Sequence, residues 1–377
     1  MQLRIGTFTV HKRFPLTISR GTTAQTTNVW VEIEHNGIQG WGEASPFTIG
    51  CHHQTTEVIV RSLQKIAPSL QAFSPLERQR IEALIRDVCL PSAASAALDI
   101  ALQDWLGKFA KLPLWQLWGL DCGRIKPTSV TIGINPPEVA QQRVRDWLGQ
   151  GTVAIPFQGI QALKVKLGNP AGIEADRAML LAVRNTAPQI EQISIDANGG
   201  WTLDQALKMV DWLAKQGVTY IEQPLAPGDE DNLLPLYQRS PLPIVVDESC
   251  FTSDDILPLA DRVHGINIKL MKSGGLTEAI KMIQTAQACG LKVMFGCYSD
   301  STLLNTALSH LSPLADYLDL DSHLNLLDDP FMGATWQNGR VIPPEQAGLG
   351  VTRLAQPPYV KKKPDLQFDD TYLPTHG

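Results

Sequence analysis

Charged residues stand near the ends of five apolar runs in the middle of the chain. The runs are ALKVKLG, ISIDANGGW, YIEQPL, VVDESC and INIKLMK. A buried parallel strand with a catalytic group at its tip has this pattern, in which an apolar run reaches a charged residue and then gives way to turn formers. We therefore predict that the charged residues lie at the C-terminal ends of strands. In chain order they are Lys164, Lys166, Asp196, Glu222, Asp247 and Lys269.

The three carboxylates, Asp196, Glu222 and Asp247, are 26 and 25 positions apart. This is about the length of one strand, one helix and two loops, so we predict three consecutive strands of a parallel barrel, whose C-terminal face carries active sites. Three carboxylates at one level repel one another unless a cation lies between them. Oxygen ligands suit one Mg²⁺ ion, or Mn²⁺, rather than zinc. The alternative, three unrelated salt bridges or helix caps, explains each residue singly but not the common spacing.

The lysines flank these carboxylates in the order of strands. If ALKVKLG is the second strand, Lys269 falls on the sixth, which lies opposite the second in an eight-stranded barrel. A substrate held between them would meet a lysine on each face. Lys164 and Lys166 are two apart and point the same way, so each lowers the pKa of the other toward a value useful for a general base. The alternative, lysines on a solvated strand, fits the apolar run poorly.

Composition limits the kinds of partner. The chain has 377 residues, 44% of them hydrophobic, which is enough for two domains. The net charge of −6 and the absence of a basic run argue against nucleic acid or an anionic membrane surface and favour a small ligand. Six scattered cysteines without C-x-x-C, no charged-then-apolar leader and no long apolar run predict a reduced, cytoplasmic protein. A homo-oligomer stays open.

Residues 1–125 read as an α+β domain with strands first. LRIGTFTV predicts a strand, the polar segment SRGTTAQTTN a connection, and Asn36-Gly37 the turn of a hairpin. Ser92 is a candidate N-cap for the helix SAASAALDIALQDWLGK. Two further helices are predicted over residues 54–70 and 75–88. We interpret Cys51-His52-His53 as a loop and not as a transition-metal site, because no second ligand pair lies nearby.

From residue 126 to 349 strands and helices alternate. TSVTIGI predicts strand one, KVMFGC strand seven and YLDLD strand eight, which with the five central runs makes an eight-stranded α/β barrel. GTVAIPFQG predicts an irregular addition before strand two. No glycine pair has the spacing of a dinucleotide site. The segment 350–377, rich in Pro and Lys, is predicted to return over the first domain.

Taken together, the motifs resemble the enolase superfamily, in its muconate-lactonizing-enzyme-like branch. The resemblance rests on SAASAALDIALQDWLGK with KLPLWQLWG, the K-x-K of strand two, the carboxylates of DANGGW, IEQPL and DES, and IKLMKSGG. Asp319-Leu320-Asp321 on the last strand resembles the mark of its dipeptide epimerases. The resemblance implies a modified TIM barrel of the (β/α)7β type with an N-terminal α+β capping domain. GTVAIPFQG is longer than the family usually has.

The implied activity is a Mg²⁺-dependent 1,1-proton transfer at the α-carbon of a dipeptide, through an enolate that the metal stabilises. Lys166 and Lys269 would be the two acid/base groups, and Lys164 would tune Lys166. The implied metal ligands are Asp196, Glu222 and Asp247.

Two further expectations concern the substrate. Asp319 and Asp321 would face the barrel mouth and bind the substrate ammonium group. Arg20, in a loop that the resemblance places over the mouth, would bind an acidic second side chain, as in L-Ala-D/L-Glu epimerases.

Alternative functions share the scaffold. An o-succinylbenzoate synthase, an N-acylamino acid racemase or a cycloisomerase would keep the metal and the lysines, but o-succinylbenzoate synthase has a substrate without an ammonium group for the aspartate pair. A catalytically silent barrel that serves as a binding or assembly module is the more distant alternative. The complete set of predicted ligands and both lysines argue against it.

Overall fold

Eight parallel strands form a barrel in the computed structural model, which describes residues 1–355. A parallel bridge between Thr128 and Leu318 joins the first strand region to the last. The predicted barrel is confirmed. Its strands are β6 (Ser129–Ile132), β7 (Ala162–Lys166), β8 (Gln192–Asp196), β9 (Val218–Glu222), β10 (Ile244–Val246), β11 (Gly265–Ile268), β12 (Lys292–Phe295) and β13 (Tyr317–Leu318).

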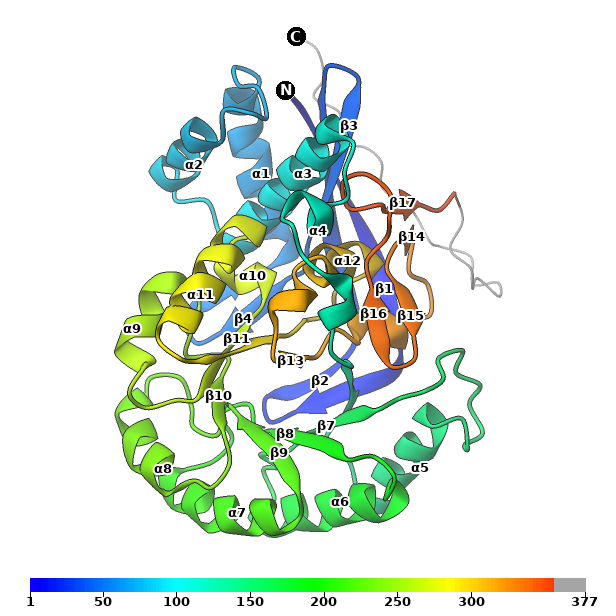
Figure 1. Ribbon diagram of the computed structural model, residues 1–377, viewed down its shortest axis with the longest axis vertical. Helices are drawn as coiled ribbons and strands as arrows, with labels where there is room; N and C mark the ends of the chain where they lie inside the picture. Colours follow the sequence, from blue (N-terminus) through cyan, green and yellow to red (C-terminus); the bar gives the residue numbers. More distant parts are fainter. Residues whose placement is uncertain (356–377) are drawn as a thin grey trace.

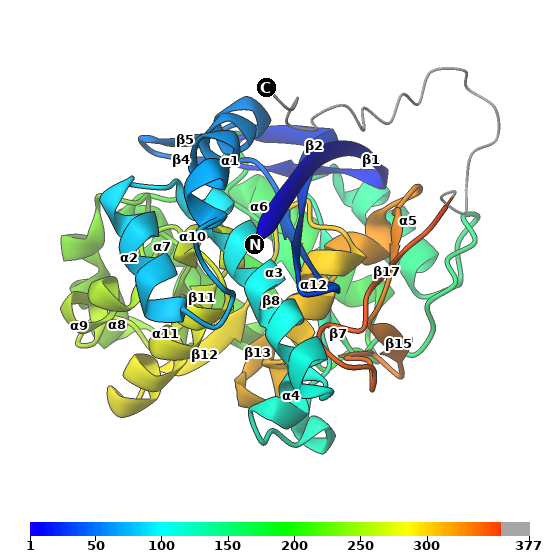
Figure 2. The same cartoon turned by 90° about the horizontal axis from the view of Figure 1, so that it is seen from above.

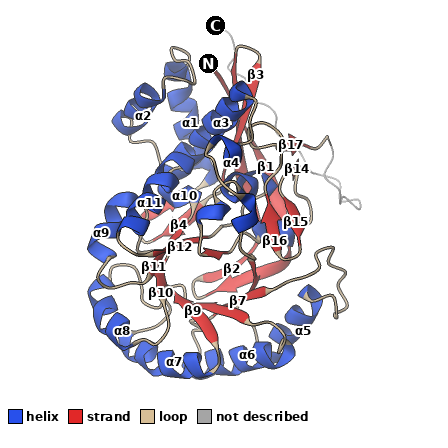
Figure 3. Cartoon of the chain, in the orientation of Figure 1, coloured by secondary structure: helices blue, strands red, loops and turns tan. Residues whose placement is uncertain are grey.

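Helices occupy all seven connections between these strands, which is the (β/α)7β pattern. They run around the outside of the strands in Figure 1, and the colours of Figure 3 separate the blue outer layer from the red inner one. They are α5 (Pro137–Trp147), α6 (Ile173–Thr186), α7 (Leu203–Lys215), α8 (Leu233–Arg239), α9 (Ile256–Leu259), α11 (Leu276–Ala288) and α12 (Thr302–Ser309), with the short α10 (Leu270–Ser273) following β11.

Local sequence explains these helices, as α7 illustrates. Thr202 and Gln205 form a reciprocal capping box at its start. The helix buries Ala206, Met209 and Leu213, which recur at intervals of three and four residues, so one face packs against the sheet.

The N-terminal part is an antiparallel sheet covered by helices, and it lies above the barrel in Figure 1. Asn36 and Gly37 both have positive φ, 54° and 76°, and form the predicted tight turn. Ser92 is not the predicted N-cap: it is the first helical residue, and its hydroxyl donates to the carbonyl of Met271 at 2.7 Å. The elements are β1 (Gln2–Ile18), β2 (Gly21–His35), β3 (Ile38–Ala44), α1 (Thr56–Leu70), α2 (Arg78–Asp87) and α3 (Ser92–Ala110).

The polar segment before the hairpin is strand, not the connection that we predicted. β1 and β2 pair along almost their whole length, down to Ile18 and Gly21, with an irregularity between His11 and Leu16. The segment is rich in threonine, a β-branched residue that favours strands, and the hydroxyls of Thr17 and Thr22 lie 2.9 Å apart across the pair. The result is a long arm, the β1–β2 hairpin, whose tip at residues 19–20 reaches the barrel mouth.

The cap is tied to the barrel through buried polar contacts. Glu43 of β3 accepts hydrogen bonds from the amides of Ser301 and Leu304, at 3.0 and 3.1 Å, at the start of α12. It also accepts one from Asn28 at 2.8 Å. Burial and the nearby Asp300 raise the pKa of Glu43 to about 8. Figure 2 shows α3 lying across the barrel elements, where it contacts α10 and α11.

Short elements complete the described chain. Cys51 is exposed, but His52 and His53 lie in a small hairpin rather than in the predicted loop. Residues 152–159 are irregular, as predicted. None of the described helices is long and apolar enough to cross a membrane. The remaining strands are β4 (Phe47–Ile49), β5 (His52–Gln54), β14 (Phe331–Met332), β15 (Thr335–Gln337), β16 (Arg340–Ile342) and β17 (Thr352–Arg353).

The C-terminal segment was predicted to return over the first domain. Its beginning, β17, pairs with β14, and the guanidinium of Arg353 lies 5.1 Å from the ring of Trp30 in β2. Residues 356–377 lie outside the described residues. The boundary at residue 125 stays a prediction.

Candidate functional site

The strand ends bring the predicted charged residues to one level of the barrel mouth. Lys166 is paired in register with Asp196, and Asp196 with Glu222, along β7, β8 and β9. Asp247 and Lys269 directly follow β10 and β11. Five of the six residues named first in the sequence therefore meet at the C-terminal face of the sheet, and Lys164 lies one step deeper.

Ion pairs link the first lysines to the carboxylates. The Nζ of Lys166 lies 2.5 Å from Asp196, and the Nζ of Lys164 lies 2.6 Å from Glu222 and 2.7 Å from Asp319. All these side chains are buried. Burial alone would lower the pKa of Lys164, but Asp319, Glu222 and Asp196 together raise it well above its ordinary value. Lys164 is therefore a fixed cation, and its predicted effect on Lys166 stays a prediction.

Asp247 is held by two further ammonium groups. Its two carboxylate oxygens lie 2.7 Å from Lys269 and 2.7 Å from Lys272. Burial works against ionisation, but these two lysines hold the pKa of Asp247 well below its usual range. Lys272 also donates to the carbonyls of Cys250 and Asn267, at 2.9 and 3.0 Å. We did not predict Lys272, although the K-x-x-K of INIKLMK carried the signal.

Polar residues next to the predicted ligands position them. Gln223 accepts a hydrogen bond from the amide of Asp247 at 2.8 Å, and Asn267 donates to Glu222 at 2.8 Å. Asn198 donates to Asp196 at 3.1 Å. Sequence reasoning missed all three, although Asn198 and Gln223 stand inside the motifs DANGGW and IEQPL.

The donor set fits a hard divalent cation. As the side chains stand, no three His, Cys, Asp or Glu residues within 1–355 converge on one metal-binding point, because the lysines lie between the carboxylates. The repulsion that we used to predict a metal is thus partly relieved by ammonium groups. One oxygen each of Glu222 and Asp247 is nevertheless buried without a hydrogen bond, although an ammonium lies within ion-pair distance. Burial and Asp196 raise the pKa of Glu222 to about 7 although Lys164 lies 2.6 Å away, so a bound cation would stabilise the charged form of this carboxylate.

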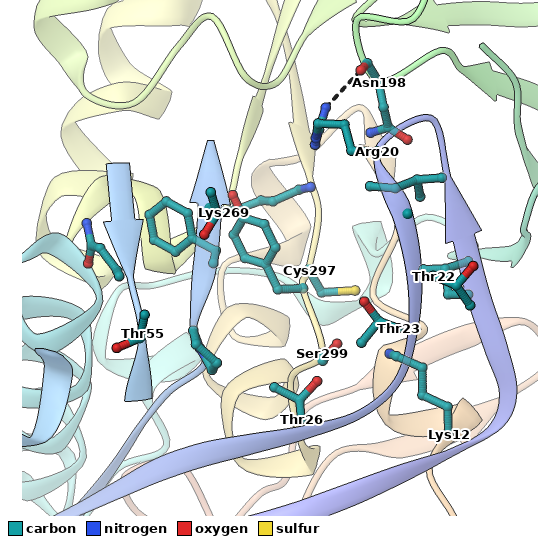
Figure 4. Close-up of a pocket in the computed structure, with 18 of the residues that line it drawn as sticks. Lys12, Arg20, Thr22, Thr23, Thr26, Thr55, Asn198, Lys269, Cys297 and Ser299 are labelled. Carbon is teal, nitrogen blue, oxygen red and sulfur yellow. Dashed lines mark hydrogen bonds between the residues drawn. The ribbon is translucent and has the colours of Figure 1, made fainter. Parts of the chain in front are cut away.

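A cavity of about 670 Å³ opens between the two outer lysines. Lys166 from β7 and Lys269 from the end of β11 both line it, with three strands between theirs. Figure 4 shows the Lys269 side of this cavity. Tyr298 lies under Lys269, with 4.7 Å from the ammonium to the ring centre, and stacks on Phe47 at 5.1 Å. The reacting part of a ligand would therefore have a lysine on either side.

The aspartate pair after β13 divides into two environments. Asp319 is occupied by Lys164 and accepts a hydrogen bond from Ser129 at 2.8 Å. Asp321 accepts one from the amide of Thr131 at 2.6 Å and forms no ion pair within residues 1–355. Burial and Asp319 raise the pKa of Asp321 to about 6. Of the two aspartates, Asp321 is thus the one that gains more from an added cation.

Arg20 lies at the tip of the β1–β2 hairpin and reaches the mouth, where the sequence placed it. Its guanidinium is 2.7 Å from the buried carboxylate of Glu248 and donates to the carbonyl of Asn198 at 2.8 Å. Figure 4 marks the second of these bonds. Glu248, which directly follows Asp247 in the DES motif, was not predicted as a site residue. Arg20 therefore already has a carboxylate partner inside the protein.

Comparison with known proteins agrees with this geometry. Residues 3–119 match the N-terminal domain of the mandelate racemase and muconate lactonizing enzymes, and residues 152–355 match the enolase C-terminal domain-like family. A hydrophobic dipeptide epimerase of a Flavobacteria bacterium is 46% identical over 91% of this chain and 95% of its own length. An L-Ala-D/L-Glu epimerase of Bacteroides thetaiotaomicron is 35% identical over 94% of this chain and 88% of its own.

A solved structure supports the same assignment. The dipeptide epimerase of Enterococcus faecalis, complexed with Mg and the dipeptide L-Leu-L-Tyr, superposes with a TM-score of 0.85 at 31% identity, over 93% of this chain and 99% of that one. These relatives favour the epimerases over the other reactions of the scaffold. The chain belongs to the enolase superfamily, in its mandelate racemase and muconate lactonizing enzyme branch, and within that branch to the dipeptide epimerases, which are isomerases.

Proposed function

We propose that this protein is a Mg²⁺-dependent epimerase that inverts the α-carbon of the second residue of a dipeptide. The observation that carries the proposal is the cavity with Lys166 on one side and Lys269 on the other, above a row of buried carboxylates. One base removes the α-proton from its face, and the conjugate acid of the other returns a proton to the opposite face. The α-carbon is thereby inverted without any other change in the substrate.

Asp196, Glu222 and Asp247 would hold the metal. When bound, Mg²⁺ stabilises the negative charge that develops on the substrate carboxylate as the α-proton leaves. The same three carboxylates hold Lys164, Lys166 and Lys269, so the lysines and the ion draw on the same oxygens. The chain keeps both lysines close to the substrate carbon and fixes their direction.

Proton exchange in D₂O tests the function directly. We expect the protein with Mg²⁺ to incorporate deuterium at the α-carbon of the second residue of L,L-dipeptides and to produce the epimer. NMR over a dipeptide library measures both. If no dipeptide exchanges its α-proton, the proposed function is wrong.

We expect Asp321→Asn to weaken binding of dipeptides that carry a free amino group. Asp321 would pair with the substrate ammonium, a charge-assisted contact whose loss weakens binding by roughly 10- to 100-fold. The N-acetylated form of the same dipeptide has no such group and should lose much less. Isothermal titration of both compounds with variant and wild type measures the difference, and an equal loss for both would remove the ammonium role.

The side chain of the second substrate residue could belong to one of two classes. The resemblance found in the sequence implies an acidic side chain that Arg20 binds. A second candidate, an apolar side chain, is supported by the pairing of Arg20 with Glu248 and by Leu16, Ile18 and Phe47 in the cavity wall. Because Glu248 already neutralises Arg20, the geometry favours the apolar class.

Wild-type protein should therefore prefer L-Ala-L-Leu to L-Ala-L-Glu. Arg20→Met leaves Glu248 buried without its ion pair, and we expect it to lower the free energy of unfolding by about 1 to 3 kcal/mol. The double variant with Glu248→Gln should recover part of this loss. Thermal unfolding measures the stability, and kcat/KM for both dipeptides measures the preference. A wild-type preference for L-Ala-L-Glu that Arg20→Met abolishes would establish the acidic candidate.

The setting of the enzyme is part of the proposal. Its partner is a small dipeptide, with no nucleic acid or membrane partner, and its place is the reducing cytoplasm. Six cysteines, all free, support that location. Whether the chain forms a homo-oligomer stays a prediction.

A further inference from the structure

A buried lysine at the other end of the cavity has no role in the proton transfer. Lys12 of β1 is only 7% exposed and lines the same cavity as Lys166 and Lys269. No hydrogen bond or ion pair engages its ammonium within residues 1–355. In Figure 4 the ammonium points inward, toward Thr23, Cys297 and Ser299. The side chain is largely buried and its ammonium faces the cavity, so an anion bound there would meet a charged donor that has no other partner.

The neighbours of Lys12 do not supply a contact partner of opposite charge. Burial lowers the pKa of Lys12, and Cys297, Asp321 and Asp300 oppose this shift from a distance. The two carboxylates have donors of their own: Asp321 accepts from the amide of Thr131, and Asp300 accepts from the amide of Tyr298 at 2.9 Å.

Hydroxyl groups surround the same end of the cavity. Thr23 and Thr26 of β2 and Ser299 after β12 all line it. An ammonium flanked by hydroxyls is a donor-rich environment, and a carboxylate, which only accepts hydrogen bonds, is the group that such an environment binds best.

We propose that Lys12, Thr26 and Ser299 form an anion subsite for the side chain of the first residue of the dipeptide, so that the preferred first residue is Glu or Asp. This inference rests on the proposed function and adds to it the class of the first residue. It follows from the order of groups: the α-carbon of the second residue would lie between Lys166 and Lys269, which line the cavity, and the amino group would lie at Asp321, which is 3.8 Å from the thiol of the lining residue Cys297. Lys12, also in the cavity wall, lies within electrostatic range of Asp321. The first side chain therefore lies next to Lys12.

Charge balance in the complex points the same way. When the substrate ammonium binds at Asp321, it neutralises this carboxylate, which no longer attracts Lys12 as strongly. Two cations would then share one carboxylate in a buried place. A carboxylate on the first side chain restores the balance and accepts hydrogen bonds from Lys12 and the hydroxyls.

A pair of isosteric dipeptides tests the subsite. We expect kcat/KM of the wild type for L-Glu-L-Leu to exceed that for L-Gln-L-Leu by about 10- to 100-fold, the scale of a hydrogen bond to a charged group. Lys12→Met should reduce this Glu/Gln ratio to within about threefold of unity, and Lys12→Arg should retain most of it. Lys65→Met removes an equal charge from an exposed position on α1 and serves as the matched control, in which the ratio should stay at the wild-type value.

Each outcome decides a separate point. A wild-type Glu/Gln ratio near one, with L-Ala-L-Leu still epimerised, overturns the subsite and leaves the epimerase intact. A high ratio that survives Lys12→Met shows that another residue binds the anion and also overturns the proposal. If no dipeptide is epimerised at all, the proposed function itself has failed. If Lys12→Met does not fold, Thr26→Val takes its place, with a smaller fall in the ratio expected.

Discussion

Lys269→Ala and Lys166→Ala should each lose net epimerisation by roughly 10³-fold, the scale of a general acid or base. The reason is geometric: each lysine serves one face of the α-carbon, so a single lysine removes and returns a proton on the same side. We therefore expect one epimer, the one whose α-proton faces the surviving lysine, to exchange that proton in D₂O without inversion. NMR of both epimers with both variants measures which proton is lost.

The matched variants are Lys269→Arg and Lys166→Arg. Arginine keeps the positive charge beside Asp247 or Asp196, but it does not lose a proton in the working pH range. These variants should be as inactive as the alanine variants if the lysines act as bases. Recovery of activity in the arginine variants would assign the lysines a purely electrostatic role. Near wild-type interconversion by any single-lysine variant would refute the two-base mechanism.

Removal of Mg²⁺ should abolish activity and lower stability. An ion that binds only the folded chain raises the free energy of unfolding by about 2.7 kcal/mol at 100 times its dissociation constant. Glu222→Gln should lose most of this stabilisation. It should also lower kcat by at least about 10³-fold, since a bound metal ion stabilises the charge of the transition state by several kcal/mol. Thermal unfolding with EDTA and with Mg²⁺ measures binding independently of activity.

Glu248→Gln is the control for the metal prediction. Glu248 is buried in the same mouth and next in sequence to Asp247, but it is paired with Arg20 and is not among the proposed ligands. Its variant should keep the Mg²⁺-dependent rise in unfolding temperature. A response lost in Glu248→Gln and kept in Glu222→Gln would show that the ligand set is wrong.

The barrel was predictable because five of its strands, β7 to β11, carry two signals at once. An apolar run such as the one before Asp196 identifies a buried parallel strand, and the charged residue that follows marks its C-terminal end. The common spacing of Asp196, Glu222 and Asp247 then fixes their order around the barrel, because one helical connection has a nearly constant length. The same signals place the two outer lysines on opposite strands.

The cap was less predictable, because its decisive contacts are made far along the chain. The threonine-rich stretch before Asn28 looks polar and loop-like, yet it is a strand because β1 offers it a partner over almost its whole length. Ser92 looks like a helix cap, yet its hydroxyl bonds to Met271, which no local pattern reveals.

Three of the charged residues that the sequence did not single out share one property. Glu248, Lys272 and Lys12 act through partners or a cavity that only the folded chain assembles. Lys12 is the clearest case, since it stands alone in a strand of the cap and carries no motif. Arg20 shows the opposite limit: its position was predicted from resemblance, but its ion pair with Glu248 was not.

The β1–β2 hairpin separates the residues that contact substrate side chains from the residues of the proposed chemistry, and this separation affects how the substrate range can evolve. Lys166 and Lys269, which we propose to break and form the carbon–hydrogen bond, stand on β7 and directly after β11. The residues that reach the same cavity from the hairpin are Leu16, Ile18, Arg20, Thr23 and Thr26. Substitutions in the arm would change which side chains fit without moving Lys166, Lys269 or a proposed ligand carboxylate. New specificities can thus arise through substitutions in the β1–β2 hairpin, while the acid/base and metal-binding residues of the barrel stay unchanged.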